Sequence, residues 1–352
     1  MKQNPAEMIE RLSRALADDF RILPLDLPDA PLFLAIALPT DEGVTGLKLR
    51  LPAGRGMTLQ QAMLTAGAEA LELRASLAQH HLAELQGLPR QDGLAVVPAT
   101  DLATGEAVAV PAQRVFLDGA SVLSEPLRED ATSTGCAVGA TRDGAVATAL
   151  WECVERDALA LWWHGNRQAG AVALEVIDAG QPRLFWWLHQ RPRVTRLLEI
   201  TTDIGLPVVV AVAADADGRV VATGSAARPA LKDAALAAVT EMVQTEVSLD
   251  LAREAGQPEA LAWIAHASMT EQPQFRPGPG RTSAPLAMPE LLARLTGLGH
   301  RALAVEMTLP GDPMPAMRVI VPGLCAMGAR TDSPRFARLC PGPPRLDLPE
   351  PF

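Results

Sequence analysis

Three apolar, helix-forming segments of this chain each carry two polar residues spaced three apart. The pairs are Glu69/Glu72, Glu152/Glu155 and Glu241/Gln244. Residues at positions i and i+3 share one helix face, so each pair projects its oxygens in one direction. Carboxylates on an apolar helix are costly unless cations or hydrogen-bond donors meet them. The pattern therefore predicts a divalent-metal site, and sites of this kind commonly also bind phosphate.

Spacing alone does not separate a metal site from a solvated helix face. Glu7 and Glu10 have the same spacing beside Arg11 and Arg14, where surface ion pairing explains them. The 69/72 pair has only Arg74 as a nearby cation, and the 152/155 pair lies between the apolar runs ALW and ALALWW. The apolar surroundings of these two pairs favour a functional interpretation.

Composition excludes several classes of protein. The chain has 352 residues, 48% of them apolar, and a net charge of −10, which argues against a dedicated nucleic-acid binder. The start MKQNPAEMIERL is polar and amphipathic, so we expect no secretory signal, and no apolar run is long enough to span a membrane. The four cysteines are far apart and form no CxxC motif, which fits a reducing cytoplasm.

Caps, periodicity and turn residues predict the order of elements. We expect helices over 5–19, 58–79, 142–163, 229–255 and 289–298, and strands over 32–38, 45–51, 206–215, 220–226, 302–308 and 316–321. Residues 53–56 and 90–130 are expected to be loops. The order lacks regular βαβ alternation and indicates an α+β fold with mixed sheets and long helices. Two glycine-containing loops that precede ExxE helices suggest an internal pseudo-duplication.

The loop around Arg55 could offer backbone N–H groups and a guanidinium to an anion. No GxxxxGK[ST] or GxGxxG motif is present, so a nucleotide would be bound without a P-loop or a Rossmann site.

Four segments, in this order along the chain, resemble the YcaO superfamily, whose members use ATP to modify peptide backbones. They are GRGMTLQQAMLTAGAEALELRAS, TSTGCAVGATRDGAVATALWECVERDALALWW, PALKDAALAAVTEMVQ and AMRVIVPGL, and they span about residues 50–325. The resemblance implies a fold with a central cavity for ATP and Mg²⁺, formed by a core over 51–330, with 1–50 as its N-terminal part and 331–352 as a proline-rich tail.

The resemblance also assigns roles to residues. It implies that Glu69, Glu72, Glu152, Glu155 and Glu241 form the magnesium and phosphate network, and that Arg55, Ser133, Arg156, Gln244 and Arg318 contact the nucleotide. Two alternatives stay open: Ser133 is equally suited to capping a helix, and Arg318 could be a surface charge at a strand end. In the tail, Pro349, Pro351 and Phe352 are candidates to reach the active site, against a simple disordered tail.

Several positions depart from the family pattern. Arg55 replaces a lysine, Thr134 replaces an asparagine, and Leu73 and Ala237 stand where arginines are usual. No carboxylate is lost, so we expect an active ATP site. The loss of two arginines keeps open a degenerate member that acts as a scaffold.

The STG sequence and ERDALALWW are most similar to the azoline-forming members of peptide natural-product pathways. The resemblance implies phosphorylation of a backbone amide oxygen, so that a Cys, Ser or Thr side chain closes a thiazoline or oxazoline ring. Thioamide or amidine formation is the alternative activity. We expect a precursor peptide as substrate and a separate leader-binding subunit of ubiquitin-activating-enzyme type, since only about fifty residues precede the first motif. A flavin dehydrogenase, and a homodimer or hetero-complex, are further expected partners.

Overall fold

In a computed structural model the chain divides into two compact units. Unit 1 consists of Met1–Leu150 and Arg301–Pro322, and unit 2 consists of Trp151–His300 and Gly323–Phe352. The structure describes residues 4–26, 31–40, 51–128, 131–280, 282–326 and 331–346. Each unit is presented separately below. The α+β expectation is confirmed, because helices accompany three antiparallel sheets.

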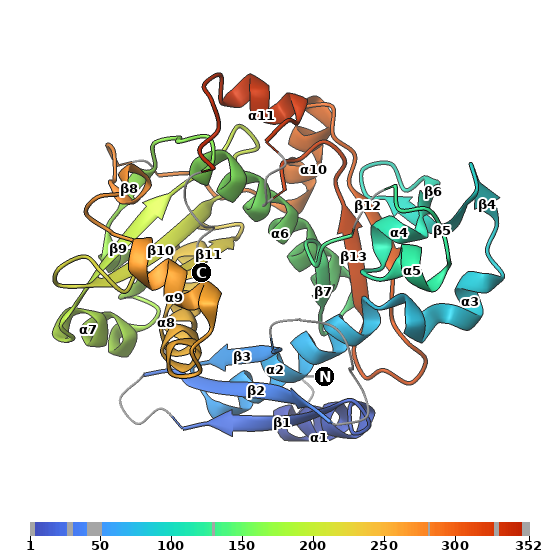
Figure 1. The fold of residues 1–352 in the computed structure, drawn as a ribbon, viewed down its shortest axis with the longest axis horizontal. Coiled ribbons are helices and arrows are strands. Elements are labelled where there is room, and N and C mark those ends of the chain that lie inside the picture. Colours follow the sequence, from blue (N-terminus) through green and yellow to red (C-terminus); the bar gives the residue numbers. More distant parts are fainter. Residues whose placement is uncertain are drawn as a thin grey trace. The chain divides into compact units, whose positions relative to one another are not determined.

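The first sheet of unit 1 has three antiparallel strands packed against two helices (Figure 1). The strands are β1 (Phe20–Leu25), β2 (Phe33–Pro39) and β3 (Ala53–Gly56), and the helices are α1 (Pro5–Ala15) and α2 (Leu59–Ala75). At the start of α2, the Gln61 N–H donates to Thr58 Oγ1 at 3.2 Å and the Met57 N–H donates to Gln61 Oε1 at 2.9 Å. The first bond is the predicted N-cap, whereas the Gln61 side chain accepts from the residue before the N-cap and not from the Thr58 N–H, as a capping box requires.

Residues 53–56 are a strand, so the predicted glycine loop is wrong. A Cβ on Gly54 would collide with the backbone of Ala66 and Ala62 on α2. Glycine therefore allows β3 to lie directly against the helix, and the GRG motif serves packing rather than a turn. α1 ends at Ala15 rather than near residue 19. The strand predicted over 45–51 lies outside the described residues except for Leu51.

The second sheet of unit 1 joins segments from distant parts of the sequence. Its order is β4-β5-β12-β13-β7, with β6 paired to β5. The strands are β4 (Arg90–Gln91), β5 (Leu94–Asp101), β6 (Ala107–Pro111), β7 (Cys136–Val138), β12 (Leu303–Glu306) and β13 (Ala316–Ile320). The expected loop over 90–130 is therefore wrong, since it contains the β5–β6 hairpin. The short helices of this region are η1 (Ala78–His81), α3 (Leu82–Gln86), α4 (Ala112–Val115) and α5 (Gly119–Val122).

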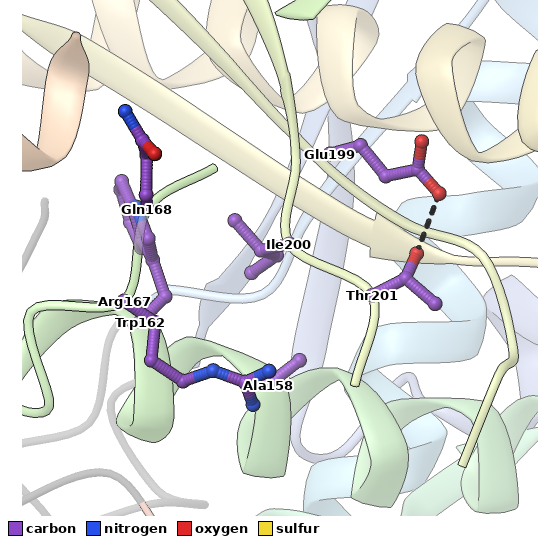
Figure 2. A pocket seen from close by; sticks show the side chains of 7 residues that line it. All are labelled: Ala158, Trp162, Arg167, Gln168, Glu199, Ile200 and Thr201. Carbon is purple, nitrogen blue, oxygen red and sulfur yellow. Dashed lines mark hydrogen bonds between the residues drawn. The ribbon is translucent and has the colours of Figure 1, made fainter. Parts of the chain in front are cut away.

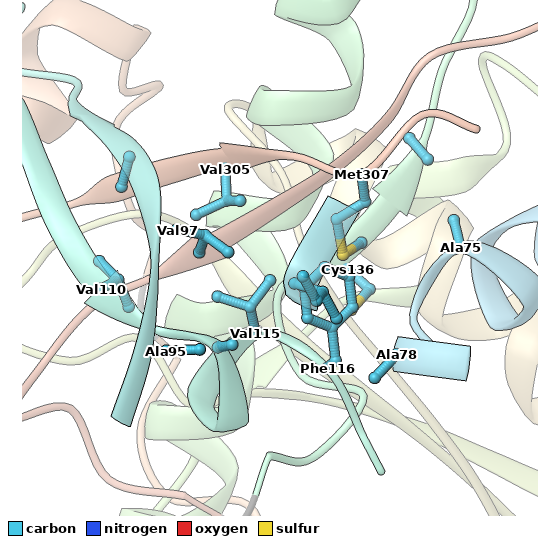
Figure 3. Packing of buried hydrophobic residues seen from close by; sticks show 14 of the residues in the cluster. Ala75, Ala78, Ala95, Val97, Val110, Val115, Phe116, Cys136, Val305 and Met307 are labelled. Atoms are coloured by element: carbon cyan, nitrogen blue, oxygen red, sulfur yellow. The ribbon is translucent and has the colours of Figure 1, made fainter. Parts of the chain in front are cut away.

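Apolar side chains fill the space behind this second sheet. Val97 and Val110 from the hairpin, Val305 from β12 and Phe116 after α4 belong to one buried cluster (Figure 3). Cys136 of β7 lies in the same cluster and is 2% exposed, as expected for a small buried thiol. This core fixes β7 and β13 next to each other, which matters for the site described below.

Unit 2 contains a four-stranded antiparallel sheet in the order β11-β10-β9-β8. The strands are β8 (Gly170–Val172), β9 (Arg193–Glu199), β10 (Val208–Asp215) and β11 (Ala222–Ala227). The predicted hairpin of β10 and β11 is confirmed, with Ala211 opposite Gly224. The long helix α8 (Leu231–Glu254) lies along β10 and β11 (Figure 1). A Cβ on Gly224 would collide with the α8 backbone at Ala238 and Met242, so glycine again permits close strand–helix contact.

The remaining helices surround this sheet or continue the chain. They are α6 (Arg142–Trp163), which contains the boundary between the units, η2 (Leu174–Ile177), α7 (Pro182–Gln190), α9 (Pro258–His266), η3 (Pro273–Phe275), α10 (Met288–Gly297) and α11 (Pro334–Leu339). Trp162, Trp163, Trp263 and Phe275 form an aromatic core with ring centroids 5.4–6.1 Å apart. The predicted pseudo-duplication is not confirmed. Among the described residues, no helix is long and apolar enough to cross a membrane.

Candidate active site

Glu155 is the most buried of the predicted metal-binding acids. It lies in the middle of α6 and is 6% exposed. Its Oε1 accepts a hydrogen bond from Ser225 Oγ at 2.7 Å, and its Oε2 accepts one from the Ala227 N–H at 3.3 Å. Both donors belong to the end of β11. These two hydrogen bonds fix the orientation of the Glu155 carboxylate against β11, and both donors belong to unit 2.

Burial raises the pKa of Glu155 to about 7. Arg156 and the hydrogen bond from Ser225 oppose this rise, whereas the negative charges of Glu241 and Glu152 add to it. Three carboxylates therefore interact within unit 2, two from α6 and one from α8. The negative charges of these three carboxylates repel one another, and a bound cation would reduce the repulsion.

Arg156 is the cation that accompanies these acids. Its Nε donates to Glu152 Oε1 at 3.4 Å, and its Nη2 lies 3.9 Å from Glu155 Oε1. Burial alone would lower the pKa of Arg156, but the charges of Glu155, Glu152 and Glu241 raise it. A third of its side chain stays exposed, so the guanidinium is fixed at one end and accessible at the other. Gln244 lies one turn along α8 from Glu241 and is partly buried.

The acids of α2 in unit 1 have different surroundings. Glu69 is exposed and Glu72 is half-buried. Arg74, the nearby cation, is already committed to Asp312, to Asp19 at 3.4 Å and to the Ala15 carbonyl at 2.5 Å. Leu73, which replaces the expected arginine, packs against the apolar cluster around Phe20. Both residues after the pair therefore make contacts that stabilise unit 1.

The structure also places the other predicted nucleotide contacts of unit 1. Arg55 is part of β3, and its carbonyl accepts a hydrogen bond from Thr65 at 3.3 Å. Ser133 is exposed in the turn before β7 and does not cap a helix, because α6 begins at Arg142 and Thr141 Oγ1 accepts from the Gly144 N–H at 3.1 Å. The helix-cap alternative for Ser133 is therefore wrong.

Arg318 is a buried residue of β13, only 4% exposed, and not a surface charge at a strand end. Its Nη1 donates to the Thr132 carbonyl at 2.6 Å and to Cys136 Sγ at 3.0 Å. Its Nε has no hydrogen-bond partner among the described residues. Arg318 thus holds both ends of the turn that contains Ser133. The tail candidates Pro349, Pro351 and Phe352 lie outside the described residues.

Three groups near the α6 acids were not predicted from the sequence. Ser225 and the Ala227 N–H hold Glu155, as described above. Arg228 follows them, and its guanidinium lies 5.5 Å from the ring centroid of Trp151, next to Glu152. Their common signal is the segment SAARP, in which a buried strand ends at Ala227, shortly before α8 begins at Leu231.

A pocket lies farther along α6 (Figure 2). Its lining comes from Ala158 and Trp162, from the loop at residues 167–168, and from the end of β9 at residues 199–201. Glu199 Oε1 accepts from Thr201 Oγ1 at 2.9 Å, as Figure 2 shows. The space holds about one water molecule. It is too small to be the predicted ATP cavity.

Comparison with known protein families identifies the family to which this chain belongs. The family described as YcaO cyclodehydratase, ATP- and Mg²⁺-binding, matches residues 75–325. The chain belongs to the YcaO family. The matched range contains the acids of α6 and α8, and ATP and Mg²⁺ are thereby confirmed as the family's cofactors.

Three known proteins show the extent of the similarity. A heterocyclase solved in complex with substrate and cofactor has a TM-score of 0.81 and 20% identity, and the match covers 99% of this chain but 57% of that one. YcaO from Methanopyrus kandleri, solved with AMPPCP and Mg²⁺, has a TM-score of 0.64 and 23% identity over 92% of this chain and 91% of that one. An uncharacterised protein in the tfuA 3′ region of Rhizobium leguminosarum bv. trifolii is 27% identical, over 77% of this chain and 76% of its own length.

The acids of unit 2 fit a magnesium nucleotide. Among the described residues, no three His, Cys, Asp or Glu side chains are close enough to form a complete metal site. Mg²⁺, however, usually takes one or two protein carboxylates and completes its octahedron with phosphate oxygens and water. A buried carboxylate with a raised pKa, two further acids and one partly exposed arginine provide such a partial site. The full five-acid set remains a prediction.

Proposed function

We propose that this chain is the ATP-dependent cyclodehydratase component of a ribosomal peptide-modifying pathway. The substrate class is a precursor peptide with Cys, Ser or Thr residues, and the products are thiazoline or oxazoline rings. The observation that carries the proposal is the buried Glu155 carboxylate, fixed by Ser225 and Ala227 among two other acids and Arg156. This arrangement is costly for stability and is explained by a bound cation.

The residues of unit 2 have separate roles in this proposal. Glu155, with Glu152 and Glu241, binds Mg²⁺, and the two donors from β11 keep Glu155 from turning away when the metal is absent. Arg156 uses its exposed end to neutralise charge on phosphate oxygens. Gln244 orients the nucleotide from α8. In unit 1, Arg318 acts on the turn that carries Ser133, and Glu69 and Glu72 remain predicted metal-binding acids.

The chemistry requires that a poor leaving group become a good one. A Cys, Ser or Thr side chain attacks the carbon of the preceding amide, and the amide oxygen receives the γ-phosphoryl group of ATP. That oxygen then departs as phosphate, while the side-chain proton and the amide proton are lost to solvent. The sum is peptide plus ATP to azoline, ADP and phosphate. We further propose that a separate protein binds the leader of the precursor and delivers it.

Mass spectrometry of the intact precursor tests the proposal. The precursor is incubated with the chain, ATP, Mg²⁺ and the candidate leader-binding partner, and each ring should lower its mass by about 18 Da, one water in the net reaction. Omitting the partner should slow the reaction strongly. Loss of ATP or Mg²⁺ should abolish it.

Other outcomes would replace the proposal by one of its alternatives. A rise of about 16 Da with added sulfide would show exchange of the amide oxygen for sulfur and hence thioamide formation. An unchanged peptide, together with partner binding that is indifferent to Glu155→Gln, would show a scaffold. The replacement of an arginine by Leu73 is the observation behind the scaffold alternative.

A further inference from the structure

α6 carries charged residues on two opposite faces. Glu155 faces the end of β11, and Asp157 is two residues farther on, about 200° around the helix. The Asp157 side chain is fully buried. Whatever binds Asp157 therefore determines how α6 is rotated about its axis, and with it the direction in which Glu155 points.

Arg335 of α11 meets Asp157 with two parallel hydrogen bonds. Arg335 Nε donates to Asp157 Oδ1 at 2.7 Å and Nη2 donates to Oδ2 at 2.7 Å. The Cys325 N–H adds a third bond to Oδ1 at 2.8 Å. The Arg335 side chain is 2% exposed, so this fork–fork contact is shielded from solvent and strongly directional.

The same guanidinium also binds Asp203 in the loop between β9 and β10. Nη2 donates to Asp203 Oδ1 at 2.7 Å and Nη1 to Oδ2 at 3.3 Å. Arg338, one turn later on α11, lies 3.5 Å from Asp203. One arginine thus joins α6, the sheet and the C-terminal helix of unit 2. A buried ion pair is a poor general stabiliser, but its geometry can specify one arrangement of the elements that it joins.

We propose that Arg335 is a positioning residue for the acids of α6 and that it acts through Asp157. The fork holds α6 at the rotation at which Glu155 reaches Ser225 and the Ala227 N–H. Arg335 contacts neither substrate nor cofactor in this role. The inference rests on the proposed function only in that the acids bind Mg²⁺.

Matched lysine substitutions test this role. Arg335→Lys keeps the positive charge and removes the planar fork. Arg301→Lys makes the same change at a pair of unit 1, where Arg301 Nε donates to Asp101 at 2.6 Å. The measurement is titration calorimetry with Mg²⁺ alone, at a temperature at which circular dichroism and thermal melts show all proteins folded. The Kd for Mg²⁺ should rise about 10-fold in Arg335→Lys, as for other residues that orient metal ligands, and stay unchanged in Arg301→Lys.

A second variant separates positioning from packing. In Asp157→Leu/Arg335→Met an apolar pair of similar volume fills the same space without directed bonds, a change that buried ion pairs often tolerate. We expect a somewhat lower melting temperature, because the Cys325 N–H and Asp203 lose these partners, with the chain still folded at the assay temperature and Mg²⁺ affinity lowered as in Arg335→Lys. Mg²⁺ affinity equal to that of the unmodified chain in either variant would overturn the proposal.

These experiments distinguish failure of the positioning role of Arg335 from failure of the proposed function. If the unmodified chain binds Mg²⁺ and Arg335→Lys binds it weakly, the positioning role stands even when no peptide ring is formed. If rings form at the normal rate and affinity in both Arg335 variants, the proposed function stands and the positioning role fails. If the unmodified chain binds no Mg²⁺ on its own, the positioning role fails, whereas the proposed function is decided by ring formation with ATP and Mg²⁺, because phosphate oxygens complete the metal site.

Discussion

The paired acids of α2 and of α6 have the same spacing but different surroundings. On α6, Glu155 is buried, held by two donors and followed by Arg156. On α2, Glu69 is exposed, and the residues after the pair, Leu73 and Arg74, pack into unit 1 or bind its own carboxylates. The spacing thus identifies helices that carry paired acids. The burial and partners of each acid show which carboxylate is buried at a cost in folding free energy. By this criterion we expect the acids of α6, rather than those of α2, to contribute most to activity.

The largest expected effect follows from removing one charge on α6. Glu155→Gln keeps the shape of the side chain and loses the metal-binding anion, so kcat for ring formation should fall by roughly 100-fold or more. Glu69→Gln, the matched change on α2, should cost about 10-fold or less, because that acid is exposed and solvent partly replaces it. Rates are measured by peptide mass against time. Equal losses in the two variants would remove the distinction between the helices.

The pH dependence of stability provides a second test of the same distinction. The pKa of Glu155 is about 7 in the folded chain against an ordinary value of 4.5, so the folded chain binds this proton more tightly than the unfolded chain. The contribution of Glu155 to the free energy of unfolding should therefore be largest below about pH 4.5 and fall by about 3 kcal/mol as pH rises through 7.

Urea unfolding in metal-free buffer measures this slope. Glu155→Gln should remove its share of the fall between pH 5 and 7.5. Added Mg²⁺ should flatten the slope in the unmodified chain, because a cation favours the ionised carboxylate. A wild-type slope that Glu155→Gln does not alter would contradict the assigned burial.

Much of this could be foreseen from the sequence, and the misses have physical causes. The caps at Thr58 and the hairpin of β10 and β11 follow from local rules, so they were predicted. Gly54 was read as a turn, because sequence shows that glycine is flexible but not that Ala66 on another element presses against it. The β5–β6 hairpin was missed because its strand partner β12 lies about 200 residues away.

In the candidate site too, local features were predicted and contacts between distant segments were missed. Glu152, Glu155 and Glu241 were predicted, since their spacing and motifs are local. Ser225, which holds Glu155, and Arg335, which holds the nearby Asp157, were not, because hydrogen bonds across 70 and 178 positions leave no periodic signal. Arg318 was expected to bind nucleotide, and this stays a prediction; its hydrogen bonds to the Thr132 carbonyl and Cys136 Sγ, which support the turn before β7, were not foreseen.

Restoring the missing arginine on α2 should not restore function. Leu73 packs against the cluster that contains Leu12 and Phe20, so Leu73→Arg should lower the free energy of unfolding by about 1–3 kcal/mol. It should not raise kcat. The control Leu73→Met keeps the volume and should cost less than about 1.5 kcal/mol. A faster enzyme from Leu73→Arg would show that the α2 acids lack a counter-charge after all.

The smallest predicted effect concerns Arg228 beside Trp151. If this cation compensates for the arginines absent elsewhere, Arg228→Met should raise the KM for ATP about 3- to 10-fold with little change in stability. Arg219→Met, at an exposed pair with Glu271, serves as the control. An unchanged KM would mean that Arg228 does not contact ATP, and Arg156 would remain the proposed ATP-binding arginine of unit 2.

The central claim is that ATP is used to remove a backbone amide oxygen, and an isotope label tests it most directly. The precursor is prepared with ¹⁸O at the carbonyl before one reactive Cys, Ser or Thr, and it is incubated with the chain and its partner. The ¹⁸O content of the released phosphate is then measured by mass spectrometry. We predict one ¹⁸O in the phosphate for each ring formed, and none when Glu155→Gln replaces the unmodified chain. Unlabelled phosphate, with ATP hydrolysed and the peptide oxygen retained, would contradict the account.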